Sequence, residues 1–390
     1  MVAVDVIYNT GARDERRELT GIAHLFEHLM FGGSVNIPRF DVELENAGGM
    51  SNAWTSNDFT NFYETLPAVN VETAFHLESD RMLALAFNPE ALEVQRSVVI
   101  EEFKQQCLNR PYGDLMHGLR DALYSPEHPY SWPVIGLEPD HVASVKDKDI
   151  REWFYSHYAP NNAVLAIAGN LSYEEGRRLV EKWFGDIPAR KIAPRSLPSV
   201  GFPKENVLKE MWGNVPNPSV VIAIPMDGRG SHDYRVTDCI TDILSAGRSS
   251  RLLQNLILNG DGTIIEADAS IIGAEEPGFM LMTAQTSSDE PHILEHVTKS
   301  LIEQLALLAG PGNVSQYELE RTLNRFESTF LLQTMSPVAL AQSLALAEIQ
   351  NEDINRVVDL QRLITTDDIS RVAADLVARP RVTVYYHPRS

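Results

Sequence analysis

Two histidines and a glutamate stand close together near the start of the chain, in the segment HLFEH that runs from His24 to His28. Residues four apart lie on one face of a helix, so both imidazoles could bind a single metal ion. Glu27 lies beside that face and could reach a water on the metal. Zinc lowers the pKa of such a water to about 7 and polarises a peptide carbonyl, while a nearby carboxylate takes the proton. The segment therefore predicts a zinc site with Glu27 as the catalytic base.

The alternative interpretation is an ordinary helix with two partly exposed histidines. The neighbours Ile22, Leu25 and Phe26 are apolar, however, and polar side chains in apolar surroundings need a partner. This setting favours the metal site.

A catalytic zinc ion normally has three protein ligands, so one more is needed. The segment EVQRSVVIEEFKQQ, read as a helix, puts Glu102 on the same face as Val98 and Val99. A carboxylate on an apolar stripe is costly unless it is paired or bound to a metal. We therefore predict Glu102 as the third ligand. Glu101, one step round the helix and easier to solvate, stays open as the alternative.

HLFEH followed by a distant VVIEE resembles the inverted-motif zinc metallopeptidases (inverzincins) of the pitrilysin and mitochondrial processing peptidase family. That family has its third ligand about 75 residues beyond the second histidine, and here the separation is 102 − 28 = 74. The segments GGMSNAWTSNDFTNFYETLP and YAPNNAVLAIAGNLSYEE are similar to family segments too, so the resemblance covers most of the chain.

The resemblance implies an α+β protein of two duplicated α/β sandwich domains of the processing-peptidase (LuxS/MPP-like metallohydrolase) type. Such proteins close like a clamshell around an unfolded peptide, which adds as a strand to a sheet edge. Asn52, Ala53, Trp54 and Thr55 would line that edge and bind substrate. In the alternative, this segment is a plain hairpin that packs Trp54 into the core.

Two departures from the family pattern bear on activity. Gln95 stands where relatives carry a glutamate, and we expect its amide to change the metal affinity without abolishing binding. Ile257 and Ile264 stand where active relatives place an Arg and a Tyr that hold the substrate carbonyl. Since neither isoleucine can donate a hydrogen bond, transition-state stabilisation is lost. The resemblance then implies a zinc-bearing subunit that pairs with a homologous zinc-free subunit or forms a homodimer.

Arg248 and Arg251, in GRSSRL, are interpreted as structural. The function expected overall is a zinc-dependent endopeptidase that hydrolyses peptides or unfolded segments. The alternative is a non-catalytic structural subunit of the same fold.

The elements expected to position these residues follow from periodicity and from turn residues. We expect sheets with helices packed on one face. The predicted elements are a strand from Val2, a helix Glu18–Met30, a hairpin turning at Ser56–Asp58, a helix Val71–Ala86, a helix from Pro89 to about Cys107, a strand Ala163–Gly169 and a helix Tyr173–Phe184.

A Pro-rich stretch divides the chain into halves that resemble one another. VAVDVIYNTGARDE opens the first half and VVIAIPMDGRGSHD the second, each with an apolar run, a turn and then a helix. The predicted domains are residues 1–188 with the zinc motif, a linker at 189–205, and a homologous domain at 206–390 without a metal motif.

The composition limits the possible partners and compartments. A net charge of −21 argues against nucleic acid as a partner, and no apolar stretch is long enough to span a membrane. Two separated cysteines predict no disulfide framework. We expect a soluble protein, cytoplasmic rather than periplasmic. A chain that starts inside a strand suggests a trimmed leading segment, which leaves export open.

Overall fold

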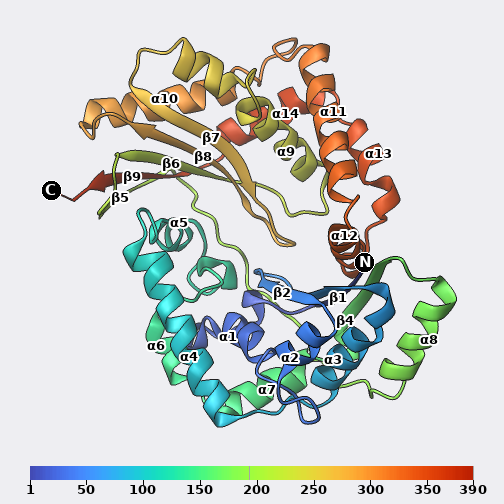
Figure 1. Cartoon of the computed structure of the whole chain (residues 1–390). Helices are drawn as coiled ribbons and strands as arrows, with labels where there is room; N and C mark the ends of the chain where they lie inside the picture. Colours follow the sequence, from blue (N-terminus) through green and yellow to red (C-terminus); the bar gives the residue numbers. More distant parts are fainter. Residues whose placement is uncertain (193, 390) are drawn as a thin grey trace. The chain divides into compact units, whose positions relative to one another are not determined.

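The computed structural model describes residues 1–192 and 194–389 (Figure 1). Residue 193, in the expected linker, and residue 390, at the end of the expected second domain, lie outside the described residues. The chain forms two compact units. Unit one comprises Met1–Lys104, Trp132–Leu197 and Thr329–Arg356, and unit two comprises Gln105–Ser131, Pro198–Ser328 and the chain from Val357 onward.

Both units contain strands and helices. The strands are β1 Val2–Tyr8, β2 Met50–Thr55, β3 Thr60–Leu66, β4 Ala163–Gly169, β5 Val207–Gly213, β6 Ser219–Pro225, β7 Ile264–Ile272, β8 Phe279–Thr286 and β9 Val382–Pro388. The α-helices are α1 Ile22–Leu29, α2 Phe40–Asn46, α3 Glu72–Leu83, α4 Pro89–Phe103, α5 Leu115–Leu123, α6 Pro139–Ser144, α7 Asp147–His157, α8 Tyr173–Phe184, α9 His232–Ser245, α10 Pro291–Ala306, α11 Gln316–Gln333, α12 Pro337–Ile349, α13 Val357–Arg362 and α14 Thr366–Ala378.

Unit one is built on an antiparallel sheet with the strand order β2-β3-β1-β4, which puts β2 at an edge. Alternate residues of β1 point to opposite faces of the sheet. Val6 belongs to the core under α1 and α7, whereas Ala3 and Ile7 pack against Ala341 and Ala345 of α12. Helices therefore cover both faces (Figure 1). The expectation of helices on one face only was wrong, because β1 is apolar on both faces.

Unit two repeats this arrangement on a sheet with the order β5-β9-β6-β8-β7. One face of β6, including Ile222, packs against α9, α10 and α14. The other face, including Val221, packs against Leu119 and Leu123 of α5. The prediction of two duplicated α/β sandwich domains is confirmed. Each unit also includes one helix from the other half of the sequence, α12 in unit one and α5 in unit two. The domain limits 1–188 and 206–390 remain predictions.

Most element predictions in unit one are confirmed, and one needs correction. The hairpin β2–β3, strand β4 and helix α8 lie where they were expected, and α3 and α4 differ from expectation only at their ends. The first helix begins at Ile22 rather than Glu18. Gly21, before it, has a φ of +87°, a left-handed conformation that breaks any helix arriving from Glu18.

No single helix among the described residues is long and apolar enough to cross a membrane. The consecutive helices α11 and α12 pass that test only together, with a bend of 112° between them.

Candidate metal centre

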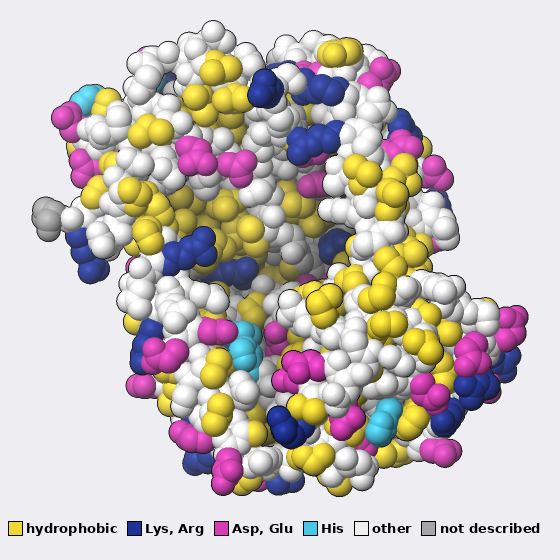
Figure 2. Space-filling view, viewed as in Figure 1, with side chains coloured by type: hydrophobic (Ala, Val, Ile, Leu, Met, Phe, Trp, Pro, Cys, Tyr) yellow, Lys and Arg dark blue, Asp and Glu magenta, His cyan; other side chains and the backbone are white. Residues whose placement is uncertain are grey.

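Helices α1 and α4 of unit one bring three potential ligands together. The Nε2 atoms of His24 and His28 lie 3.3 Å apart. Glu102 Oε2 lies 3.5 Å from the Nε2 of His24 and 3.7 Å from that of His28. In Figure 2, adjacent histidine side chains reach the surface of unit one beside acidic side chains, where Figure 1 places α1. Two residues one turn apart on α1 and one on α4 thus converge on a point.

The dimensions of this triangle fit zinc. Two ligand atoms about 2.0–2.1 Å from a tetrahedral zinc ion lie about 3.3–3.4 Å apart, within a few tenths of an ångström of the three observed separations. The chemistry of the atoms fits as well. Burial, and the neighbouring His28, lower the pKa of His24 to about 4, so its imidazole is neutral at neutral pH, as a metal ligand must be.

The two glutamates that sequence left as alternatives face different surroundings. Glu102 is half-buried and turned toward the histidines. Glu101 is exposed and forms an ion pair with Lys104 at 2.5 Å. Of the two, Glu102 has the position that a third ligand requires.

Glu27 lies on α1 between the two histidines, and its carboxylate is held by β2. The Thr55 hydroxyl donates a hydrogen bond of 2.5 Å to Glu27 Oε2. Burial is the largest influence on Glu27 and raises the pKa of its carboxyl, and the charge of Glu102 acts in the same direction. Thr55 and His28 partly oppose this shift. A raised pKa brings a carboxylate closer to the range in which it works well as a general base.

The two imidazoles are supported differently on their other ring nitrogen. His28 Nδ1 lies 3.3 Å from Gln95 Oε1, so a proton on Nδ1 is donated to the amide and leaves Nε2 as the ligand atom. His24 Nδ1 is buried, and it has no hydrogen-bond partner among the described residues.

The edge strand β2 splits the four residues predicted to bind substrate between its two faces. Ala53 and Thr55 face α1, where Ala53 packs on the core and Thr55 meets Glu27. Trp54 faces the other way and is partly buried against the cluster that includes α12. Asn52 is exposed, and its side chain accepts the Ala53 N–H. For Trp54 the geometry favours the packing alternative.

The positions matched to a family Arg and Tyr lie in unit two. Ile264 is buried in the core, and Ile257 is partly buried against it. Arg251 donates to Glu318 at 3.0 and 2.8 Å, which agrees with its interpretation as a structural residue.

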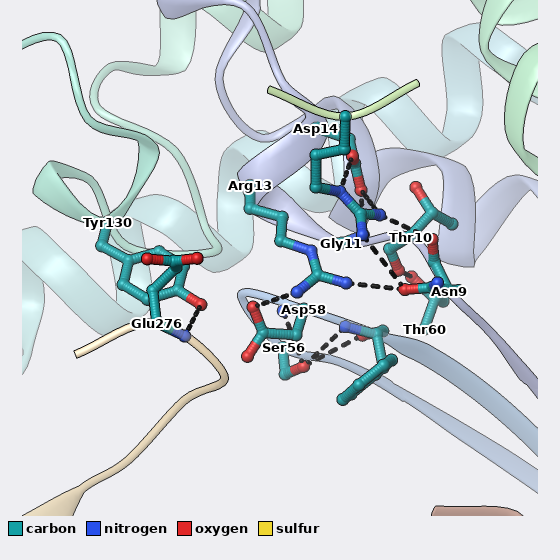
Figure 3. A network of polar contacts seen from close by, with 12 residues as sticks. Asn9, Thr10, Gly11, Arg13, Asp14, Ser56, Asp58, Thr60, Tyr130 and Glu276 are labelled. Atoms are coloured by element: carbon teal, nitrogen blue, oxygen red, sulfur yellow. Dashed lines mark hydrogen bonds and ion pairs between the residues drawn. The ribbon is translucent and has the colours of Figure 1, made fainter. Parts of the chain in front are cut away.

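A buried polar network that sequence reasoning missed fixes the turn leading into β3. Arg13, in the loop after β1, donates to Asp58 at 3.0 Å and to Asn9 at 2.6 Å (Figure 3). Arg195 donates to Asp14 and, like Arg13, to Asn9. The signal available in the sequence was the charged segment ARDE, which follows an apolar strand after a turn of three residues. By fixing this turn, the network helps to set the position of β2.

Comparison with known proteins places these features in context. The protein-family model "Insulinase (Peptidase family M16)" matches residues 1–122, which include His24, His28 and Glu102. The family model "Peptidase M16 inactive domain" matches residues 144–326. The zinc protease PqqE of Helicobacter pylori is 26% identical over 96% of this chain and 84% of that protein. The uncharacterized zinc protease YmxG of Bacillus subtilis is 25% identical over 94% and 91%.

Two further similarities concern a subunit and a solved structure. The beta subunit of the Saccharomyces cerevisiae mitochondrial-processing peptidase is 22% identical over 94% of this chain and 82% of its own. The crystal structure of a protease from Helicobacter pylori has a TM-score of 0.88 and 24% identity, and covers 99% of this chain and 94% of that one.

Proposed function

The chain belongs to peptidase family M16, and on that premise we propose that it is a zinc-dependent endopeptidase that hydrolyses peptides or unfolded segments. The observation that carries the proposal is the triangle of His24, His28 and Glu102, whose sides of 3.3, 3.5 and 3.7 Å suit tetrahedral zinc. Relatives that align over nearly the whole chain are named zinc proteases, which supports the same chemistry.

Each polar residue at the centre has a task in this proposal. Zinc bound by such a triad supplies Lewis acidity, which polarises a carbonyl and acidifies water. His24, His28 and Glu102 hold the ion. Glu27 accepts the proton from the attacking water and returns it to the leaving amine. Thr55, through its hydrogen bond to Oε2, fixes the carboxylate and leaves Oε1 to carry the proton.

The substrate is proposed to bind along β2. This strand is an edge of the sheet, and Thr55 ties it directly to the catalytic base. A peptide that adds as a further strand would therefore pass beside Glu27. Backbone pairing does not depend on side-chain identity, so we expect extended, unfolded segments to be preferred over folded proteins.

A second subunit is part of the proposal. Ile257 and Ile264 contribute to the core of unit two and offer no hydrogen-bond donor from their side chains. A homologous zinc-free chain would supply the missing donors. A second copy of this chain is the alternative partner, but it carries the same two isoleucines and would bring no donor at these positions. One relative is itself named a subunit of a processing peptidase.

A non-catalytic structural subunit is the second candidate. The same two isoleucines favour it, as does the description of the family model that matches residues 144–326.

The test is cleavage of an unstructured, fluorogenic peptide library by the purified chain, alone and with a candidate zinc-free partner. We expect cleavage that a chelator abolishes and that added zinc restores. Glu27→Gln should still bind zinc but lose about 10²–10⁴-fold in turnover, because it removes the base and no ligand. Stoichiometric zinc without cleavage under either condition would favour the structural candidate.

A further inference from the structure

A buried carboxylate outside the triad contacts the beginning of the metal-binding helix. Glu15 Oε1 accepts the backbone N–H groups of Gly21, at 3.0 Å, and of Ala23, at 2.9 Å. Glu15 Oε2 accepts the indole N–H of Trp132 at 2.9 Å. Burial raises the pKa of Glu15, whereas the three N–H groups act in the opposite direction and favour the ionised carboxylate, which accepts at both oxygens. Both oxygens of this side chain are thus engaged, one by the helix and one by Trp132.

We call the two hydrogen bonds from the backbone of Gly21 and Ala23 to Glu15 the anchor of helix α1. The helix needs it because α1 is short and because no side chain caps its first turn. It has eight residues, and helices this short are not stable by themselves in water. Its first residue follows Gly21, and no side chain at that position caps the helix. The first amides of a helix have no acceptor within it, so an outside oxygen has to supply one. Glu15 satisfies two of these amides with a single atom.

The surroundings of Gly21 leave little room for another arrangement. Its φ of +87° is a conformation that other residues adopt only with strain. A Cβ at this position would lie 3.0 Å from the Ile135 carbonyl oxygen and 3.0 Å from Val142 Cγ2. The first turn of α1 is therefore fixed by packing on one side and by Glu15 on the other.

This anchor bears mainly on His24. His28 is held through its Nδ1 by Gln95, but His24 Nδ1 has no hydrogen-bond partner among the described residues. His24 directly follows Ala23, whose N–H is bonded to Glu15. The direction of the His24 imidazole therefore depends on the backbone of the first turn.

We propose that Glu15 and Trp132 are positioning residues of the metal centre. Trp132 fixes the Glu15 carboxylate, the carboxylate fixes the first turn of α1, and that turn places the His24 imidazole opposite His28 and Glu102. The proposal rests on the proposed function, since it assumes that the triad binds zinc.

The first test measures zinc affinity by competition with a chromophoric chelator. Glu15→Gln should weaken binding about tenfold, the lower range for groups that support a metal ligand. Its Nε2 group is a donor, so it must face either the Trp132 N–H or the two backbone N–H groups. Glu18→Gln makes the same change on an exposed residue three positions further on, and should bind zinc as the wild type does.

A double-mutant cycle separates positioning from general destabilisation. Trp132→Phe removes one hydrogen bond and should weaken zinc binding about fivefold. In that background Glu15→Gln should cost little more, because its Nε2 group no longer meets a competing donor. Wild-type affinity in Glu15→Gln, or single effects that multiply in the double variant to about fiftyfold, would overturn the proposal.

Hydrogen–deuterium exchange of the metal-free protein gives a measurement independent of zinc. Exchange over residues 21–29 should be about tenfold faster in Glu15→Gln than in Glu18→Gln, while β4 stays as protected as in the wild type. Equal hydrogen–deuterium exchange over α1 in both variants would also refute the claim that Glu15 stabilises this helix. A wild-type chain that bound no zinc would refute the proposed function, and exchange over α1 would still decide the anchoring by Glu15. Should Glu15→Gln expose β4 as well, Trp132→Phe replaces it, and unchanged exchange over α1 in that variant counts against the proposal.

Discussion

The zinc affinities of Glu102→Gln and Glu101→Gln, compared with each other, show which of these two adjacent residues is a metal ligand. Glu102 has a side chain that is 34% exposed, with an oxygen 3.5 and 3.7 Å from the two Nε2 atoms. Glu101 is 61% exposed and forms an ion pair with Lys104. The two changes remove one negative charge each, on adjacent residues of one helix, so they differ chiefly in geometry.

The expected magnitudes follow from that difference. Loss of a group that merely supports a ligand weakens metal binding by about 10–100-fold, so loss of the ligand itself should cost at least about 100-fold, or about 2.7 kcal/mol. An exposed ion pair contributes about 0–1 kcal/mol, so Glu101→Gln should change zinc affinity by less than about fivefold. Chelator competition measures both constants, and thermal unfolding checks that both variants fold. Equal zinc affinity in the two variants, or a larger loss in Glu101→Gln, would refute the assignment of Glu102.

Three further predictions concern neighbouring groups. Thr55→Val should lower kcat about tenfold or more, because the Glu27 carboxylate loses its hydrogen bond, while KM and the zinc content stay unchanged. Thr55→Ser keeps a hydroxyl and should restore most of the lost kcat. A Ser variant as slow as the Val variant would contradict the role of the hydroxyl. Gln95→Leu removes the contact with His28 Nδ1 and should therefore weaken zinc binding about 10–100-fold. Chelator competition measures the zinc affinity, and an unchanged affinity would speak against a role for that contact. Burial raises the pKa of Asp5 to about 7, so the folded chain keeps a proton that the unfolded chain releases near pH 4. The free energy of unfolding therefore falls as pH rises from about 4 to about 7. Asp5→Asn should therefore reduce the difference between urea midpoints at about pH 5 and about pH 8, and an undiminished difference would assign it to other groups.

Much of unit one could be predicted from local sequence. The apolar run of β4, the amphipathic α8 with its Ser172 cap and the polar turn between β2 and β3 all carry their signal within a few residues. The spacing of HLFEH likewise fixes two imidazoles on one face of a helix, wherever that helix packs.

The remaining features depend on contacts between distant parts of the sequence. The late start of α1 follows from the left-handed Gly21, which packs against Ile135 and Val142. The partnership of Glu15 with Trp132 joins residues 117 positions apart. Neither contact leaves a periodic pattern that a reader of one sequence could follow.

The packing of one helix from each half on the sheet of the other half was not predicted from the sequence either. In sequence, α12 lies within the second half and α5 within the first, yet α12 packs on the sheet of unit one and α5 on that of unit two. The clue in the sequence was the nearly unbroken apolar run of β1 and of β6, because a strand that is apolar on both faces needs a cover on each.

The central claim, that α1 and α4 hold one zinc ion between them, is tested most directly by diffraction from zinc-loaded crystals on both sides of the zinc absorption edge. We predict a single anomalous peak in unit one, about 2.0–2.2 Å from the Nε2 atoms of His24 and His28 and from a carboxylate oxygen of Glu102. Fully loaded crystals with no anomalous density among these three side chains, or with the zinc bound elsewhere on the chain, would contradict it.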